Sequence, residues 1–510
     1  MATITQSPPA DDPIVEPALE SAAREPVVAG FHPDPSICRV GDDYYLVHSS
    51  FEYQPGLPIW HSTDLVSWTQ IGNALDHAAL AGASNASGGI YAPTIRHRDG
   101  TFWIITTDIA AGDGQLVVSA TDPRGPWSAP WRVEGAVGID PDLAWDEEGC
   151  IVTYCSGDPE LRGIAQVRVD LPSGRLLERP RAVWPGAGLA FPEAPHLYRR
   201  GSWWYLMLAE GGTERGHAVT IARSRHPEGP FEAHPHNPVF SHRSSTHPVQ
   251  NVGHADLVER PDGSWAAVYL GVRPRGTTPM FHVNGRETFL AGIDWEDGWP
   301  VFVEDRFSVP APDRSFVEIF AAPLSPRWVS PGAPVSAQLT PLADGRGARV
   351  TPVQTGSRAT TAVVTRVTDL RWRFDVDLDR IDGSAGILLR LDDAHLAEVR
   401  VEAAAGGPMA SCTVRIGPLE QRLGDAVHLS DGDAVTVVIE SVDPTTGGPD
   451  DIVLGVIQSG RRHDFARIDG RYFSTEVAGG FTGRVVGFRS RAGSFSITSA
   501  TYTAHRIEAG

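Results

Sequence analysis

Carboxylates and a histidine stand at matching positions of a short pattern that occurs five times in the chain. The pattern is a small or polar start, a Pro or Ala, an aliphatic residue, a turn and an aromatic-rich strand. Its instances are DPSICRVGDDYYLVHS from Asp34, APTIRHRDGTFWIITT from Ala92, DPDLAWDEEGCIVTYC from Asp140, APHLYRRGSWWYLMLA from Ala194 and HADLVERPDGSWAAVY from His254. Tyr91 and Glu193 directly precede the second and fourth instances. Carboxylates and imidazoles are suited to acid–base catalysis.

If these starts converge, Asp34, Asp140, Glu193 and His254 surround one axis. Like charges held close in a partly desolvated pocket raise one another's pKa, so the arrangement would be costly if it were only structural. Glycoside hydrolysis needs one carboxylate ionised and one carboxylic acid protonated near neutral pH. Taken singly, each Asp-Pro is typical of a turn and a lone histidine is typical of a half-buried structural residue. Their recurrence at matched positions favours the catalytic interpretation.

The spacing of the pattern indicates the elements that must position these residues. The repeats start 48 to 60 residues apart, which suits one four-stranded blade per repeat and predicts a five-bladed β-propeller. In a propeller the innermost strands line the central channel, so their starts meet at its mouth. Each repeat carries a Gly- and Asp-containing turn flanked by strand-forming residues, and no long helical periodicity is present.

The repeat stops near Phe316, where a Pro-rich join, FAAPLSPRWVSPGAP, leads into polar–apolar alternation. Such alternation is typical of half-buried antiparallel strands, and a run of short strands of this kind favours a β-sandwich. The sequence therefore predicts an all-β chain with a C-terminal β-sandwich after the propeller. The expected divisions are a flexible N-terminal segment at 1–26, the catalytic propeller at 27–315 and the sandwich at 316–510.

The charge, the cysteines and the N-terminal segment indicate which partners and which location to expect. The net charge of −20 repels phosphate backbones and anionic membranes, so neither nucleic acid nor a membrane is expected. The four cysteines include no CxxC pair, which favours reduced thiols. The N-terminus has no secretory signal pattern and no apolar run approaches the ~18 residues of a membrane span, so a cytoplasmic location is expected. A homo-oligomer is left open.

Several segments together resemble glycoside hydrolase family 43, in the branch whose propeller carries a C-terminal β-sandwich. They are VVAGFHPDPSI, GIDPDL, PEAPHLY followed by AEGGT, VGHADLV, GRETFLAGIDWEDGWP and STEVAGGFTGRVVGF. The resemblance implies an inverting hydrolase with Asp34 as general base, Glu193 as general acid and Asp140 as the carboxylate that orients the acid and raises its pKa. Inversion requires base and acid to lie about 6.5–9.5 Å apart.

The same resemblance implies a set of substrate-binding residues. Arg286 corresponds to an arginine that reaches the substrate hydroxyls, Phe51 and Tyr91 correspond to rings that wall the sugar, and His254 lies where the family keeps an axial histidine. In some relatives that histidine helps hold a calcium or other ion. We expect no metal-ligating set and no required cofactor, with a calcium ion near His254 as the alternative.

The function implied is an exo-acting inverting glycosidase that releases β-D-xylose and/or α-L-arabinofuranose from xylan- or arabinan-derived oligosaccharides. The segment GGIYAPTI has Tyr91 and Thr94 where many β-xylosidases of the branch show Trp and Asp, and it looks more like arabinofuranosidase relatives. Ala194 replaces the glycine of a common EGPH motif and removes no functional group. Two alternatives stay open: an endo-acting arabinanase and a non-catalytic carbohydrate-binding propeller.

Overall fold

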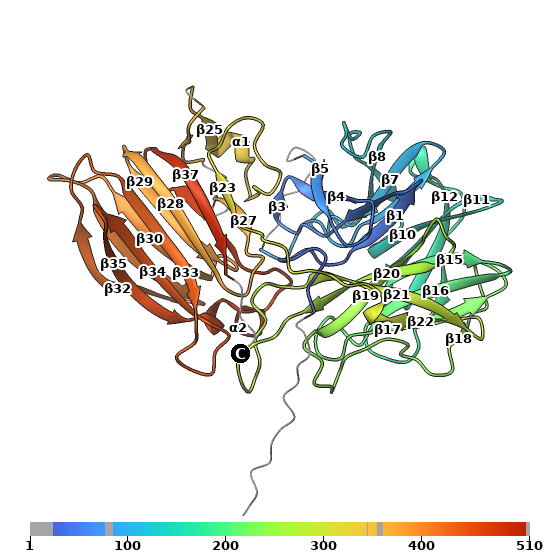
Figure 1. Cartoon of the computed structure of the whole chain (residues 1–510). Helices are drawn as coiled ribbons and strands as arrows, with labels where there is room; N and C mark the ends of the chain where they lie inside the picture. Colours follow the sequence, from blue (N-terminus) through green and yellow to red (C-terminus); the bar gives the residue numbers. More distant parts are fainter. Residues whose placement is uncertain (1–23, 77–84, 344, 354–360, 506–510) are drawn as a thin grey trace, which may run out of the picture.

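The computed structural model describes residues 24–76, 85–343, 345–353 and 361–505 (Figure 1). In these residues the protein is all-β, as predicted, and its two α-helices have four residues each: α1 (Val335–Gln338) and α2 (Thr475–Ala478). The described 3-10 turns are η2 (Leu171–Ser173), η3 (Glu304–Arg306) and η4 (Gly470–Phe473). No described helix is long and apolar enough to cross a membrane. The segment predicted to be flexible, 1–26, lies outside the described residues except for its last three.

The chain up to Val303 forms five consecutive antiparallel sheets. The first contains β1 (Ser36–Val40), β2 (Asp43–Val47), β4 (Gly56–Ser62) and β5 (Thr69–Leu75). The second contains β6 (Thr94–Arg98), β7 (Thr101–Thr106), β8 (Gly114–Ala120) and β9 (Trp131–Glu134). The third contains β10 (Gly138–Asp146), β11 (Gly149–Ser156), β12 (Ile164–Asp170), β13 (Arg175–Leu176) and β14 (Arg181–Trp184).

The remaining two sheets of this series repeat the same order. The fourth contains β15 (Glu193–Arg200), β16 (Trp203–Glu210), β17 (Ala218–Ser224) and β18 (Glu232–Ala233). The fifth contains β19 (Gln250–Glu259), β20 (Trp265–Val272), β21 (Glu287–Glu296) and β22 (Trp299–Val303). The first strands contact one another in the order β1, β6, β10, β15 and β19, and β19 returns to β1, so they form a closed ring.

The turn within each repeat connects the first strand of a sheet to the second. In β1–β2 the last pair is Val40 with Asp43, and in β6–β7 it is Arg98 with Thr101, so both are two-residue hairpins. Gly41 and Gly100 in these turns have φ of 62° and 76°. That left-handed conformation favours glycine and is what a tight hairpin requires. The predicted hairpins are therefore present at these positions.

Beyond residue 315 the strands form two larger sheets, at the left of Figure 1. The eight-stranded sheet contains β23 (Phe316–Glu318), β25 (Leu339–Pro341), β26 (Ala348–Val350), β28 (Trp372–Ile381), β33 (Val435–Val442), β34 (Asp451–Gln458), β35 (Arg461–Asp469) and β37 (Phe495–Ala504). The six-stranded sheet contains β27 (Val363–Arg366), β29 (Ser384–Arg390), β30 (His395–Glu402), β31 (Met409–Ile416), β32 (Leu419–His428) and β36 (Val485–Ser490). Side chains of both sheets share one apolar core, which includes Trp372 and Phe488.

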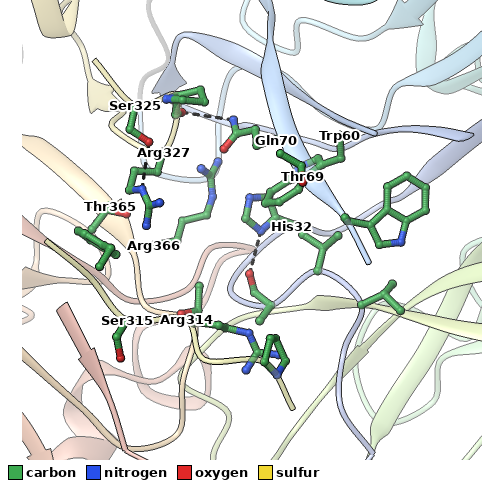
Figure 2. A pocket seen from close by; sticks show the side chains of 18 of the residues that line it. His32, Trp60, Thr69, Gln70, Arg314, Ser315, Ser325, Arg327, Thr365 and Arg366 are labelled. Atoms are coloured by element: carbon green, nitrogen blue, oxygen red, sulfur yellow. Dashed lines mark hydrogen bonds between the residues drawn. The ribbon is translucent and has the colours of Figure 1, made fainter. Parts of the chain in front are cut away.

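The two parts of the chain are joined by specific contacts. The short strand β3 (Tyr53–Gln54) pairs with β24 (Ser330–Pro331), and the buried Arg390 guanidinium lies 2.7 Å from a Glu52 carboxylate oxygen. A cavity of about 430 Å³ also lies at this junction (Figure 2). Arg366 lines it and donates from Nε to the Phe31 carbonyl at 3.0 Å. None of the carboxylates predicted to be catalytic lines this cavity.

Candidate active site

Four of the five repeat starts have a backbone conformation that is rare for residues other than glycine. Asp34, Asp140, Ala194 and His254 all have positive φ, between 47° and 56°, a region that non-glycine residues rarely adopt. Bulges interrupt the strand register beside these positions in β10, β15 and β19. A bulge bends its strand and redirects a side chain, and such strain is found mainly at functional sites.

Asp34 is buried and held ionised. Its Oδ1 accepts from Arg286 Nη1 at 2.9 Å and its Oδ2 accepts from the Ser49 hydroxyl at 2.5 Å. Burial acts to raise the pKa of Asp34, but the Arg286 guanidinium and the Ser49 hydroxyl outweigh it, so the pKa lies below its ordinary value. A carboxylate kept ionised in this way can accept a proton from water.

Asp140 and Glu193 are in the opposite electrostatic state. Burial, Glu193 and Asp34 raise the pKa of Asp140 well above its ordinary range, and burial and Asp34 raise the pKa of Glu193. The Ala194 backbone N–H donates to Asp140 Oδ2 at 3.1 Å and favours the ionised form of that carboxylate. The pair therefore retains a proton at a higher pH than ordinary carboxylates do, which a general acid requires.

Arg286 has a role that the sequence did not show. The same Nη1 that contacts Asp34 also donates to the Thr213 hydroxyl at 3.0 Å, while Nε has no hydrogen-bond partner in the structure. Arg286 is thus the counter-ion of Asp34, and its predicted contact with substrate hydroxyls remains a prediction.

Three aromatic rings enclose the side of the site beside Arg286. Phe51 and Tyr91, both predicted, have ring centroids 5.9 Å apart. The third ring is Phe481, whose centroid is 6.2 Å from Phe51 and 6.1 Å from Tyr91. The Arg286 guanidinium carbon lies 5.4 Å from the Phe481 ring centroid. Phe481 comes from the C-terminal part of the chain and was not predicted. The signal that could have indicated it is the Gly-Gly-Phe pattern, an aromatic residue that follows two glycines in a loop.

The Phe481 loop is fixed by contact with the N-terminal part. The Ser87 hydroxyl accepts from the Phe481 backbone N–H at 2.8 Å. A Cβ at Gly480, whose φ is 83°, would approach the Ser87 Oγ to 2.4 Å. Glycine is therefore required here for the close approach that brings Phe481 to the site.

His254 is buried beside the ionised base. Its Nδ1 lies 3.4 Å from Asp34 Oδ1, and its ring centroid is 6.3 Å from that of His196. Burial lowers the pKa of His254 to about 3, so the ring is neutral. Gly253 leaves room for the neighbouring His217, because a Cβ there would meet that imidazole at 2.3 Å. The calcium alternative at His254 remains an expectation.

A second cluster contains four residues that lie two positions after a repeat start, together with Arg96, which lies four positions after Ala92. We call it the inner network; its members are Ser36, Arg96, Asp142, His196 and Asp256. Arg96 donates to Asp256 from Nη1 and to Asp142 from Nη2, both at 2.8 Å. His196 Nδ1 lies 3.0 Å from Asp142, and the Ser36 hydroxyl donates to Asp256 at 2.7 Å. This network was not predicted from the sequence, although four of its five members share one repeat position.

The inner network also locates Thr94. This residue occupies the repeat position of Ser36 and Asp142 and is 1% exposed. Its repeat position is therefore that of the inner network and differs from that of the outer carboxylates, by which we mean Asp34, Asp140 and Glu193. Its bearing on sugar choice would be indirect.

The N-terminal part of the chain is similar in sequence to known proteins. Residues 23–300 match the model of glycosyl hydrolases family 43. A xylosidase/arabinosidase of Butyrivibrio fibrisolvens is 46% identical over 294 residues, which cover 55% of this chain and 56% of that protein. A non-reducing end alpha-L-arabinofuranosidase of Bacteroides ovatus is 45% identical over 289 residues, covering 55% and 54%. The match thus spans about half the length of these curated relatives.

Solved structures extend the similarity over most of the chain. A GH43B protein of the Bacteroides ovatus xyloglucan locus superposes with a TM-score of 0.85 and 31% identity, covering 94% of this chain and 99% of that one. A xylan beta-1,4-xylosidase of Bacillus halodurans superposes with a TM-score of 0.84 and 27% identity, also covering 94% and 99%. The family model covers more than half of the sequence. The chain belongs to glycoside hydrolase family 43.

Proposed function

We propose that the five consecutive sheets are the blades of a five-bladed β-propeller at 27–315, and that the two larger sheets form a β-sandwich at 316–510. Three observations support this division: the closed ring of first strands, the shared core of the two larger sheets, and the pairing of Phe316 in β23 with Tyr502 in β37.

The activity proposed is that of an exo-acting inverting glycosidase acting on small oligosaccharides. The observation that carries it is the opposite electrostatic state of the outer carboxylates: Asp34 is paired with Arg286, whereas burial and neighbouring carboxylates raise the pKa values of Asp140 and Glu193. A single site then offers one ionised base and one protonated acid.

In the proposed reaction Asp34 takes a proton from water as the water attacks the anomeric carbon. Glu193 gives its proton to the departing glycosidic oxygen, and Asp140 orients the acid and helps keep it protonated. The neutral His254 lies beside the base, and Arg286 and Ser49 each donate a hydrogen bond to it.

The sugar proposed is a terminal pentose, α-L-arabinofuranose and/or β-D-xylose. The names of the relatives from Butyrivibrio fibrisolvens and Bacteroides ovatus agree with this class. Release from a chain end is supported by Phe481, because this ring lies across one side of the site beside Phe51 and Tyr91. The cytoplasmic location, the absence of nucleic-acid and membrane partners, and the oligomeric state remain predictions of the sequence.

The test is hydrolysis of aryl β-D-xylopyranoside, aryl α-L-arabinofuranoside and a natural pentose disaccharide by wild type and Glu193→Ala. We expect wild type to release pentose and the variant to lose most activity on the disaccharide but less on the aryl substrates, since an activated leaving group needs less protonation. The exposed Glu296, changed to Ala, is the matched control.

Each alternative has its own outcome in this experiment. If wild type releases no sugar from any substrate, the remaining interpretation is a non-catalytic carbohydrate-binding propeller. Release of internal oligosaccharides from debranched arabinan, without pentose, would indicate an endo-acting arabinanase. Undiminished disaccharide hydrolysis by Glu193→Ala would overturn the choice of acid.

A further inference from the structure

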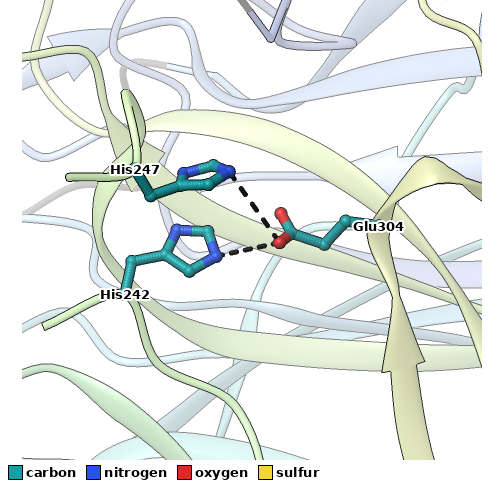
Figure 3. A group of neighbouring side chains, drawn as sticks. All are labelled: His242, His247 and Glu304. Carbon is teal, nitrogen blue, oxygen red and sulfur yellow. Dashed lines mark hydrogen bonds and ion pairs between the residues drawn. The ribbon is translucent and has the colours of Figure 1, made fainter. Parts of the chain in front are cut away.

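Two histidines and a glutamate meet at the edge of the fifth sheet, away from the outer carboxylates. His242 and His247 lie in the segment that leads into β19, and Glu304 begins η3, directly after β22. Figure 3 shows both imidazoles pointing toward the Glu304 carboxylate. One ligand-capable atom from each residue lies within 4.8 Å of the others, and among the described residues this is the one such group of three.

Both ring nitrogens of His242 lie beside hydrogen-bond acceptors, an arrangement that a second ring proton or a bound cation would satisfy. Its Nδ1 lies 2.8 Å from the Val249 carbonyl and its Nε2 lies 2.9 Å from Glu304 Oε2, so both ring nitrogens face acceptors. A neutral imidazole carries only one N–H and can satisfy one of them. The other contact needs either a second proton or a metal ion bound to Nε2.

The geometry of His247 favours the metal. Its Nδ1 lies 3.0 Å from the same Val249 carbonyl, and its Nε2 lies 4.0 Å from Glu304 Oε2. The Val249 N–H also lies 3.2 Å from this Nδ1. In the tautomer in which both Nδ1 atoms donate to the closer Val249 carbonyl, both Nε2 lone pairs face the same carboxylate oxygen. A ligating histidine characteristically donates its other N–H to a backbone carbonyl in this way.

Glu304 is itself oriented for this role. The Tyr269 hydroxyl donates to Oε1 at 2.6 Å and the Arg24 guanidinium lies 3.4 Å from the same oxygen, which leaves Oε2 facing the imidazoles. Two imidazole nitrogens and one carboxylate oxygen are a ligand set of zinc, with room for water at a fourth position. Calcium and magnesium prefer oxygen ligands and fit less well.

We propose that His242, His247 and Glu304 form a structural site for a divalent transition metal, with zinc as the best-fitting ion. The ligand spacings of 2.9 and 4.0 Å bracket the ~3.3 Å expected between ligands of tetrahedral zinc, so small side-chain movements suffice. The ion would fasten the segment that leads into β19, the strand that carries His254, to the 3-10 turn η3 that follows the last strand of the same sheet.

The experiment measures zinc binding to the full chain after chelator treatment, by calorimetry and by metal analysis after dialysis. We expect one tightly bound zinc per chain, a melting temperature that rises with zinc concentration, and a tetrahedral absorption spectrum when cobalt replaces zinc. His247→Ala and Glu304→Gln should each weaken binding by more than ~100-fold, the upper end of what losing a supporting partner costs. His247 is the more exposed histidine, and Glu304→Gln keeps the side-chain shape.

The matched control is His236→Ala, which removes an exposed histidine outside the cluster and should bind zinc as wild type does. The proposal is overturned if wild type retains no zinc beyond a non-specific background. It is equally overturned if His247→Ala and Glu304→Gln bind zinc as tightly as the control, because the metal would then lie elsewhere.

Discussion

The outer carboxylates and the inner network come from neighbouring positions of the same repeats, yet their charges are balanced in different ways. In the inner network one guanidinium, Arg96, lies between Asp142 and Asp256, and both aspartates are fully buried. Burial acts to raise the pKa of Asp256, but Arg96 outweighs it and holds the pKa below the ordinary range. The Asp256 carboxylate is therefore neutralised by Arg96 and stays ionised.

Among the outer carboxylates Arg286 pairs with Asp34, whereas burial and Glu193 raise the pKa of Asp140. Paired buried charges stabilise a fold only if their desolvation is compensated, whereas uncompensated ones shift their pKa values. The buried carboxylates of the inner network thus have a cation between them, whereas Asp140 and Glu193 keep raised pKa values, as the proposed function requires.

The largest expected effect is on catalysis at the outer layer. Asp34→Asn removes the proton acceptor, so we expect kcat to fall about 10²–10⁴-fold on aryl pentosides and on the disaccharide alike. This distinguishes base from acid, since Glu193→Ala should spare activated leaving groups. Steady-state kinetics with circular dichroism as a folding check would measure it, and equal losses for the two variants on every substrate would contradict the assignment.

In the inner network the expected effect is on stability. Arg96→Met leaves Asp142 and Asp256 buried without their cation, and breaking a buried ion pair in this way costs about 3–5 kcal/mol. Urea unfolding would measure the change in the free energy of unfolding. A loss below ~1 kcal/mol would show that the network is not what stabilises the ring.

A smaller effect of opposite sign is expected for Asp140→Asn, which removes a buried charge that has no cation of its own. We expect a gain of about 0.5–2 kcal/mol in stability at neutral pH, together with loss of activity. Because the folded pKa of Asp140 is raised, the folded wild type binds more protons than the unfolded chain between the two pKa values. Wild-type stability therefore falls with rising pH in that window, and the gain of the variant grows there.

Thermal unfolding of Asp140→Asn and wild type from pH 4 to pH 8 would reveal that trend. A gain that is constant over this range, or a variant less stable than wild type at pH 7, would contradict the raised pKa.

The smallest expected effect concerns the ring supplied from the C-terminal part. Phe481→Ala removes one of three mutually contacting rings, and such contacts contribute about 0.5–1.5 kcal/mol. We expect KM for aryl α-L-arabinofuranoside to rise several-fold with kcat changed less. Exposed Val317, changed to Ala, is the control in the C-terminal part. An unchanged KM would place the sugar away from Phe481.

The outer carboxylates and His254 could be predicted because they occupy or directly precede one repeat position. Asp34, Asp140 and His254 are each the first residue of a matching segment, and Glu193 directly precedes one, so a single pattern identified them all. Arg96 was missed because it lies two residues after the start of β6. A charged residue there is easily interpreted as part of the solvent-facing side of a strand whose polar and apolar residues alternate. Phe481 was missed because nothing local links it to Phe51, more than 400 residues earlier.

The sequence by itself determined the all-β class, the five repeats and the identity of the outer residues, because strand alternation and hairpin turns are encoded over a few neighbouring positions. Only the tertiary structure decided which carboxylate received the arginine, which ring covers the site and which buried charges are neutralised. These depend on distances between segments that are remote in the chain, and electrostatic interactions depend on such distances and on burial.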